Sequence, residues 1–413
     1  MSRIIFVFAD WFEEDPVLVG RLFSDLVRGK EHYSFAYEDD WLLRKDQACL
    51  NIDPDLGMYP GPQHSVDEQN FRVFLDSCPD RWGRLLMQRR EAVLARQEQR
   101  IARSLQESDY LLGVSDETRM GALRFKTDPD GPFLSDNRRL ATPPMTSLRE
   151  LARAVNEIEL NNHPEDPEYA KWLSVLIAPG SSLGGARPKA SVADETGALW
   201  IAKFPSGYDD RDNAAWEYLA YLLAREAGIA MSECRLDQYQ SPFRTFLTKR
   251  FDRVGGQRIH FSSAMTQLKY HDGEVGASYL ELAEFLTNQG SRTAEDLAQL
   301  WRRIIFNIAI SNVDDHLRNH GFLHDGQGWR LSPAYDLNPI PMATGLSLNI
   351  DDKSNELSYD LAFDVAEFFR LTESRAENIF LEVLSAVGAW RAVADGLRIP
   401  RSEQESMKSA FRI

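Results

Sequence analysis

The pattern of hydrophobic and polar positions divides the chain into a separate N-terminal region, a β-containing part and a helical part. Near the N-terminus, short apolar runs at residues 3–8, 33–37 and 41–43 are rich in aromatic residues and predict a small β region. Residues 80–105 instead repeat Leu, Ala, Arg, Gln and Glu over many turns, which predicts a long helix. The Asp-, Pro- and Gly-rich residues 126–144 form the best candidate linker.

The next part predicts a helix over residues 147–160, a strand–loop–strand unit in PGSSLGGARPKASVA and ALWIAKF, and a helix that closes at Gly228. Apolar runs around residues 243–251 and 259–261 predict two further strands.

From residue 278 onward the pattern becomes helical. Thr293 and Asp296 have the spacing of a capping box, in which two side chains satisfy backbone groups at a helix start. The helix that they begin, which contains LAQLWRRIIFNIAIS, is apolar on most faces and is expected to be buried. We therefore expect an α+β protein with parts at 1–130, 131–260 and 261–413.

Composition narrows the class of protein. The 413 residues are 43% hydrophobic and 27% charged, which is typical of soluble globular proteins. No apolar run approaches the roughly 20 residues that cross a bilayer, and the N-terminus lacks a signal-peptide pattern. The cysteines are few and scattered (Cys49, Cys78 and Cys234), which argues against a disulfide framework and favours a cytoplasmic location.

The net charge of −16 argues against a dedicated nucleic-acid binder. One stretch is rich in basic residues despite the negative net charge, because seven arginines lie between residues 81 and 103. Two readings stay open for them: a solvated helix face balanced by acids elsewhere, or a docking surface for a protein or nucleic acid.

The most informative stretch is NVDDHLRNHGFLHDGQGWRLSPAYDLNP, residues 312–339. Asp314 is followed five residues later by Asn319, and Asp336 comes after a polar turn and an apolar run. Phosphoryl transfer from Mg-ATP uses such a set: one carboxylate accepts the proton of the attacking hydroxyl, and a carboxylate and a carboxamide hold Mg²⁺. Taken alone, the same residues could simply form turns.

Upstream residues favour the phosphotransfer reading. Gly184 and Gly185 allow backbone N–H groups to approach phosphate oxygens, although a plain turn is the alternative. Lys203 lies in an apolar strand, in the order expected of a kinase strand lysine, and Glu217 follows on a predicted helix, where it would orient that lysine. The segment LTKRFDR could bind adenine through its backbone, with Asp252 reaching the ribose.

Departures from the protein-kinase pattern are also informative. His316 follows the predicted base instead of preceding it, and the last acid lies in AYDL instead of D-F-G, which excludes an ordinary eukaryotic-type kinase domain. Asp315 is a rival for the role of base, but only Asp314 has the five-residue offset to Asn319.

Together, SSLGGARPKA, IAKFP, NVDDHLRNHGFL and LSPAYDLNP resemble the HipA-type toxin kinases of bacterial toxin–antitoxin systems. PDRWGRLLMQRR and DYLLGVSDETRMGALRF are similar to that family's N-terminal subdomain, so the resemblance covers nearly the whole chain. It implies a bilobal protein-kinase-like fold: an additional N-terminal subdomain (1–130), an N-lobe with the ATP loop and strand lysine (131–260), and a mostly helical C-lobe (261–413).

The resemblance also implies roles for individual residues. Asp314 becomes the catalytic base, and Asn319 and Asp336 become the Mg²⁺ ligands. The residues implied to contact ATP, besides Asn319 and Asp336, are Gly184, Gly185, Ala186, Arg187, Pro188, Lys189, Lys203, Lys249, Arg250, Phe251, His316 and Tyr335.

In that family the substrate is a protein serine or threonine, and the best-known targets are aminoacyl-tRNA synthetases such as the glutamyl enzyme, whose inhibition brings dormancy and persistence. The resemblance implies autophosphorylation of the loop at Ser182, with Ser181 as a possible alternative. The added charge should expel the loop and switch the kinase off. The implied partner is a helix-turn-helix antitoxin, through which this chain would mainly meet operator DNA. Two alternatives stay open: a small-molecule phosphotransferase, and a non-catalytic regulator that binds ATP or the antitoxin.

Overall fold

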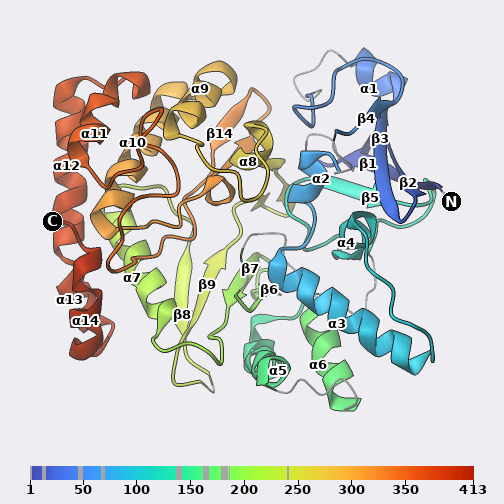
Figure 1. The fold of residues 1–413 in the computed structure, drawn as a ribbon, viewed down its shortest axis with the longest axis horizontal. Coiled ribbons are helices and arrows are strands. Elements are labelled where there is room, and N and C mark those ends of the chain that lie inside the picture. The colour runs from blue at the N-terminus through green and yellow to red at the C-terminus, as the bar shows by residue number, and fades with distance from the viewer. Residues whose placement is uncertain are drawn as a thin grey trace. The chain divides into compact units, whose positions relative to one another are not determined.

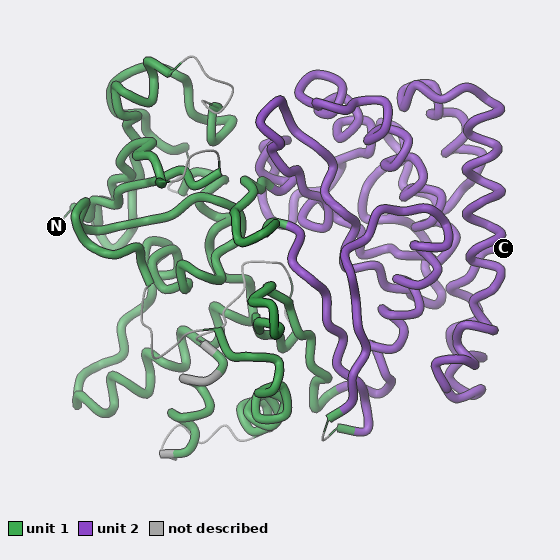
Figure 2. Tube along the Cα trace, turned by 180° about the vertical axis from the view of Figure 1, so that it is seen from behind, with its two compact units in different colours: residues 1–208, 239–241, 252–262 green, residues 209–238, 242–251, 263–413 purple. Residues whose placement is uncertain are grey.

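The computed structural model describes residues 2–11, 15–44, 50–66, 70–135, 142–160, 167–177, 185, 187–239 and 241–413. The chain separates into two compact units, shown in different colours in Figure 2. Unit 1 contains residues 1–208, 239–241 and 252–262, and unit 2 contains residues 209–238, 242–251 and 263–413. No helix in the described ranges is long and apolar enough to cross a membrane.

Unit 1 begins with an antiparallel sheet of five strands in the order β4-β3-β2-β1-β5, drawn in blue and cyan in Figure 1. The strands are β1 (Ser2–Ala9), β2 (Val17–Val27), β3 (Lys30–Tyr37), β4 (Gln63–His64) and β5 (Leu123–Lys126). Alternate residues of β1, such as Ile5 and Val7, point into a core with Leu22 and Phe35, because side chains in a strand alternate between its faces. The strands predicted at 3–8 and 33–37 are thus confirmed.

The helices of unit 1 are α1 (Asp39–Leu43), α2 (Arg72–Asp76), α3 (Arg81–Gln97), α4 (Glu107–Gly113), α5 (Leu148–Leu160) and α6 (Pro167–Ile177), with the 3₁₀ turn η2 (Met145–Ser147). The prediction of β structure at residues 41–43 is wrong, because these residues form the end of α1, in which Trp41 is fully buried. The long predicted helix is α3. It begins at the N-cap Asp80 and ends at Gln97, eight residues before the predicted end.

Three of the seven arginines in α3 and the segment after it pair with nearby acids. Arg84 forms two hydrogen bonds with Glu107, at 2.6 and 2.7 Å. Arg100 pairs with Glu91, and Arg103 lies 3.0 Å from Asp109. These contacts favour the reading of a solvated, charge-compensated face over that of a docking surface.

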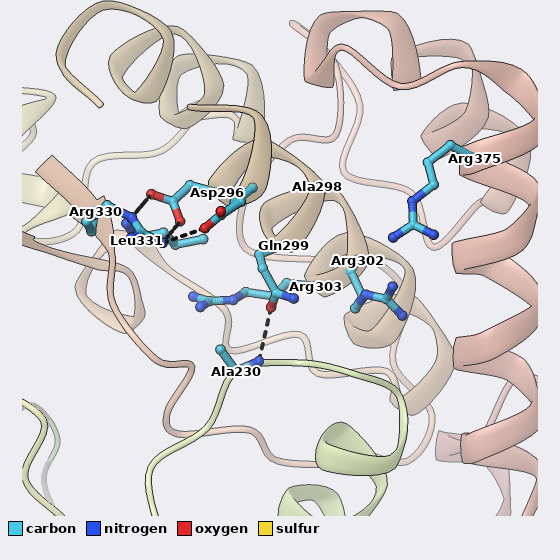
Figure 3. Close-up of a pocket in the computed structure, with 10 residues that line it drawn as sticks. Ala230, Asp296, Ala298, Gln299, Arg302, Arg303, Arg330, Leu331 and Arg375 are labelled. Atoms are coloured by element: carbon cyan, nitrogen blue, oxygen red, sulfur yellow. Dashed lines mark hydrogen bonds and ion pairs between the residues drawn. The ribbon is translucent and has the colours of Figure 1, made fainter. Parts of the chain in front are cut away.

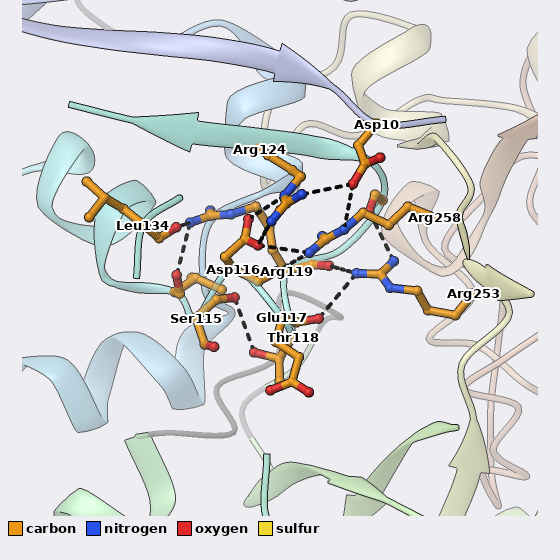
Figure 4. Close-up of polar contacts among 12 residues, drawn as sticks. Asp10, Ser115, Asp116, Glu117, Thr118, Arg119, Arg124, Leu134, Arg253 and Arg258 are labelled. Atoms are coloured by element: carbon orange, nitrogen blue, oxygen red, sulfur yellow. Dashed lines mark hydrogen bonds and ion pairs between the residues drawn. The ribbon is translucent and has the colours of Figure 1, made fainter. Parts of the chain in front are cut away.

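The short strands β10 (Arg253–Val254) and β11 (Gln257–Arg258) form a hairpin that is held to the N-terminal part of unit 1 by a buried ionic cluster (Figure 4). Asp116 accepts hydrogen bonds from Arg124 at 2.6 Å and from Arg258 at 3.1 Å. The guanidinium of the fully buried Arg119 donates to three backbone carbonyls. Burial lowers the pKa of Arg119 to about 10, so it stays charged at neutral pH.

Unit 1 also contains the hairpin of β6 (Lys189–Ala193) and β7 (Leu199–Lys203), which confirms the predicted strand–loop–strand unit. Its turn contains Gly197, which has φ +81°. The side chain of Asp194 accepts hydrogen bonds from Thr196, Ala198 and Trp200, which lowers the pKa of Asp194 well below its usual range. These contacts fix the turn and therefore the pairing of the two strands.

Unit 2 is mostly helical. Its α-helices are α7 (Asn213–Glu226), α8 (Ala264–Gln267), α9 (Tyr279–Gln289), α10 (Thr293–Ile310), α11 (Tyr359–Asp364), α12 (Glu373–Gly388), α13 (Trp390–Gly396) and α14 (Arg401–Met407). Its 3₁₀ turns are η3 (Leu317–Asn319), η4 (Ala366–Phe369) and η5 (Lys408–Ala410), and its hairpins pair β8 (Cys234–Asp237) with β9 (Thr245–Lys249) and β13 (Gly321–His324) with β14 (Trp329–Leu331). The remaining strand, β12 (Phe261–Ser263), lies at the division between the units.

The long buried helix predicted before residue 312 is α10, in which every residue from Leu300 to Ile310 is buried. The capping box predicted at its start is wrong. Thr293 is the first helical residue and not the cap, and its hydroxyl donates to the carbonyls of Leu286 and Gly290. The capping box instead begins α9, where Ser278 and Glu281 satisfy each other's backbone N–H groups.

Candidate active site

The segment predicted to carry the chemistry follows α10 directly in unit 2. Ser311 ends that helix in the left-handed conformation, with φ +50°, and lets the chain turn sharply. Asn312 donates to the side chain of Asn307 in α10 at 3.0 Å, and its own side-chain oxygen accepts from the N–H of Asn338 at 3.3 Å. A buried amide therefore joins both ends of the segment to the most buried helix of the unit.

Asp314 and Asn319 are brought together by the turn η3. The side-chain Nδ2 of Asn319 donates to the backbone carbonyl of Asp314 at 2.9 Å, while the carboxylate of Asp314 is 67% exposed. Asn319 is only 4% exposed. His316 lies beside Asp314, with 4.0 Å between its Nε2 and the Asp314 carboxylate. The five-residue offset therefore places an accessible carboxylate on a fixed backbone.

Asp315 has a different environment from its neighbour. Its Oδ2 accepts a short hydrogen bond from the hydroxyl of Tyr279, a second from Asn307 Nδ2 at 2.7 Å, and lies 2.8 Å from His320 Nε2. Asp315 is 2% exposed. Burial and the Asp315 carboxylate raise the pKa of Tyr279 well above its usual value, so this phenol remains a donor. A carboxylate so enclosed cannot reach a substrate hydroxyl, which leaves Asp314 as the accessible acid of the two.

Asp336 has a left-handed backbone, with φ +58°. Non-glycine residues adopt this conformation rarely, and such residues cluster at functional sites. Its Oδ1 accepts a hydrogen bond from Asn338 Nδ2 at 3.1 Å. The preceding Tyr335 donates its hydroxyl to the carbonyl of Arg318 at 2.8 Å, next to Asn319. The Tyr335–Arg318 hydrogen bond thus holds the segment of Asp336 next to the turn that contains Asn319, within unit 2.

The predicted hinge residues also belong to unit 2. The ring of Phe251 packs against that of Tyr335, with 5.6 Å between the centroids. Lys249 ends β9, and its N–H donates to the carbonyl of Glu233, whereas Arg250 is 3% exposed. The structure therefore brings Phe251 to Tyr335, as an adenine-binding wall would require.

Asp252 does not have the role expected from the sequence. Its side chain is fully buried in unit 1, where it accepts hydrogen bonds from the N–H of Gly121 at 2.8 Å and from Arg253 at 2.7 Å. These contacts hold the 252–262 segment in place. The prediction that Asp252 reaches a ribose is wrong for this structure, since its carboxylate is enclosed.

Lys203 and Glu217 lie in different units. Lys203 is the last residue of β7 and is partly exposed, and Glu217 is 8% exposed in α7. A glutamate buried to this extent is unusual for an ordinary surface residue. The ion pair between them stays a prediction.

The predicted ATP loop is described only in part. Ser181, Ser182, Gly184 and Ala186 lie outside the described residues. Gly185 is exposed and has φ +106°, which favours glycine, and Arg187 and Pro188 lead into β6.

Lys189, the last residue of the predicted loop, pairs with Asp80 instead of facing solvent. Its Nζ lies 3.0 Å from the Asp80 carboxylate, and both side chains are at most 3% exposed. Asp80 in turn accepts from Gly83 at 2.7 Å as the cap of α3. The pair therefore fixes the end of the loop segment to α3, and contact of Lys189 with ATP stays a prediction.

We expect Lys189→Met to destabilise the protein by about 3–5 kcal/mol, because removing one partner leaves the other buried charge uncompensated. Urea denaturation measures this. The matched control is Lys171→Met, because Lys171 is exposed on α6 and should give no measurable change. Equal stability of the two variants would contradict the anchoring role of the Asp80–Lys189 pair.

Comparison with known proteins identifies the family. Residues 181–390, just over half of the chain, match the HipA-like C-terminal domain. The chain belongs to the HipA-like family. Two relatives from Sinorhizobium fredii, named putative kinases Y4mE and Y4dM, are 29% and 28% identical over 33% and 47% of this chain. The matches cover 33% and 54% of those two proteins, so this chain matches about half of their length or less.

The fold of the HipA-like chain is similar to that of a chain in the solved complex of Shewanella oneidensis HipA, HipB and operator DNA. The TM-score is 0.64 at 15% identity, and the similarity covers 97% of this chain and 92% of that one. The predicted α+β, HipA-like fold is thereby confirmed. The division at residues 130 and 260 stays a prediction.

Sequence reasoning missed the buried network around Asp315. Tyr279, Asn307 and His320 come from three separate elements and all contact the Asp315 carboxylate, and Asn307 also donates to the Tyr279 hydroxyl at 3.2 Å. One signal was available: Asn307 is a single amide within the apolar run IIFNIAI, and a buried amide requires partners. Asp80 was missed because nothing in the sequence pairs it with Lys189.

Proposed function

We propose that this HipA-like protein is a serine/threonine-protein kinase that uses Mg-ATP. The observation that carries the proposal is the arrangement in unit 2, where an accessible Asp314 is fixed by Asn319 and linked through Tyr335 to the left-handed Asp336. Such a set of acid, amide and acid suits phosphoryl transfer, in which the protein mainly positions groups and stabilises charge. The relatives named putative kinases support the same class of reaction.

The residues present fit a magnesium ion. Mg²⁺ prefers oxygen ligands and is usually held by one or two side chains together with phosphate groups. The carboxylate of Asp336 and the side-chain oxygen of Asn319, whose Nδ2 is used on Asp314, are ligands of this kind. When bound, the ion would neutralise charge on the phosphates of ATP.

In the proposed mechanism Asp314 accepts the proton of the attacking serine or threonine hydroxyl as the γ-phosphoryl group is transferred. Lys203 contacts a phosphate and is oriented by Glu217, and Gly184 and Gly185 lie against the phosphates. Phe251 and Tyr335 contact the base, with His316 near the nucleotide. Ser182, or Ser181, receives phosphate in an autophosphorylation that switches the kinase off.

The biological role is proposed from the family and from its structural neighbour. That neighbour is a toxin–antitoxin complex of HipA with HipB and operator DNA. We propose that this chain is likewise the toxin of a pair, neutralised by a helix-turn-helix antitoxin and meeting operator DNA mainly through it. Its target would be a cytoplasmic translation protein, such as the glutamyl-tRNA synthetase.

The test is transfer of labelled γ-phosphate from ATP to proteins of a bacterial lysate. We expect phosphoserine or phosphothreonine in a small set of proteins, lost when EDTA removes magnesium and restored when magnesium is returned. The variant Asp336→Asn should remain folded and inactive, because it loses a charged metal ligand. Labelling of small hydroxylated compounds but of no protein would contradict a protein kinase.

A further inference from the structure

Unit 2 contains a cavity of about 410 Å³ outside the proposed kinase residues (Figure 3). Its volume lies in the range of roughly 300–1,000 Å³ that is typical of small-molecule sites. The wall comes from residues 295–303 of α10, from the end of β14, from Ala230 before β8 and from α12. None of Asp314, Asn319 and Asp336 lines it.

Four arginines line this cavity, and two of them are already neutralised. Arg330 forms a two-pronged pair with Asp296, at 2.8 and 3.0 Å. Arg302 lies 2.6 Å from the carboxylate of Glu382 and also donates to the carbonyl of Ala227. These two guanidinium groups therefore belong to the framework of the cavity.

Arg303 is the unusual member of the set. It is 2% exposed, and its one described hydrogen bond runs from Nη2 to the carbonyl of Ser332. Its Nε and Nη1 are buried and have no hydrogen-bond partner among the described residues. Burial lowers the pKa of Arg303 to about 10, so the group is charged at neutral pH. Buried donors without partners are rare in folded proteins, and Arg303 is one of the residues that line the cavity.

Arg375 provides an exposed cation from the wall that α12 forms. It lies in the first turn of α12, and its exposed guanidinium has no ion pair within the described part of the chain. In Figure 3 the guanidinium of Arg303 extends toward the side where Arg330 lies, and Arg375 lies beyond Arg302 on the other side. The cavity wall thus holds one exposed cation, Arg375, and the buried positive charge of Arg303.

We propose that this cavity binds a small phosphate ester. Arginine suits phosphate because its planar N–H groups match pairs of phosphate oxygens. The cavity is larger than one phosphate group. Its wall also contains the apolar residues Ala230, Ala298 and Leu331, which would contact the organic part of a phosphate ester. Gln299, fixed by hydrogen bonds to Ala230 at 3.0 Å and to Gly228 at 2.9 Å, also lines the cavity.

The test is isothermal titration of the full chain with ribose 5-phosphate, inorganic phosphate and ribose at constant ionic strength. It is performed in the background Lys203→Met with Asp336→Asn, which weakens phosphate binding at the proposed kinase site. We expect saturable binding of ribose 5-phosphate, weaker binding of inorganic phosphate and none of ribose. Tighter binding of inorganic phosphate than of the ester would overturn the assignment to an ester.

Two variants decide whether the cavity is the site. Arg375→Gln removes a charged contact and should weaken binding about tenfold. Gln299→Glu keeps the acceptor for Ala230 and adds a negative charge, so it should weaken binding by a similar factor. The matched control is Arg401→Gln, an exposed arginine in the first turn of α14, which should leave binding unchanged.

Equal affinity in Arg375→Gln and Arg401→Gln, or no saturable binding in the background protein, would overturn the proposal. These outcomes leave the kinase proposal unaffected, because phosphotransfer is measured separately with Lys203 and Asp336 intact. Conversely, a protein without kinase activity could still bind the ester in this cavity.

Discussion

Replacing Asp314 with asparagine should lower the rate of phosphoryl transfer by about 10²–10⁴-fold while leaving the fold and ATP binding unchanged. Loss of a positioned general base typically has an effect of this size. The side chain of Asp314 is 67% exposed, and Asn319 contacts its backbone carbonyl and not its carboxylate. The measurement is the initial rate of phosphate incorporation at saturating ATP, with ATP affinity and thermal unfolding measured on the same samples.

The control for this experiment is Asp352→Asn, which neutralises an exposed acid in the loop after residue 350. It should retain the wild-type rate. If Asp314→Asn were as active as this control, Asp314 would not be the base, and the catalytic assignment within unit 2 would fail.

Replacing Asp315 with alanine should instead act on stability, with a loss of about 3–5 kcal/mol. The change removes the one carboxylate oxygen that Tyr279, Asn307 and His320 share, and leaves three buried polar groups without that partner. The free energy of unfolding from urea denaturation measures the loss.

Tyr279→Phe is a milder change, because it keeps the ring and the Asp315 carboxylate and removes only the hydroxyl, which donates to Asp315 and accepts from Asn307 at 3.2 Å. It should cost about 1–2 kcal/mol. Asp315→Ala and Tyr279→Phe are close in space, so their double variant should be less destabilised than the sum of the two. A value for Asp315→Ala within error of the wild type would contradict the anchoring role of this network.

The sequence predicted the elements with strong periodicity. The helix predicted to close at Gly228 and the buried helix before residue 312 match α7 and α10, because their apolar residues repeat at helical spacing over several turns. The short run at 41–43 was mistaken for a strand, since a few apolar residues cannot distinguish a strand from one helical turn. Thr293 was mistaken for a cap because two neighbouring helix starts, at 278 and 293, carry similar signals.

The candidate site was predictable where its residues lie close in the sequence. The offset from Asp314 to Asn319 fixes a local turn, so their contact follows from spacing. The environments of Asp314 and Asp315 were not predictable, because exposure of one and enclosure of the other depend on Tyr279 and Asn307 in other helices. For the same reason, the burial of Asp252 and of Lys189 could not be foreseen.

Phosphopeptide mapping of the purified wild-type chain after incubation with Mg-ATP shows directly whether the protein is an active kinase. We expect phosphate on Ser182 or Ser181 in the wild-type protein, and none in Asp314→Asn or in the presence of EDTA. Absence of phosphate from the wild-type loop together with tight ATP binding would contradict a catalytic kinase. Equal labelling of the wild type and Asp314→Asn would contradict the proposed base.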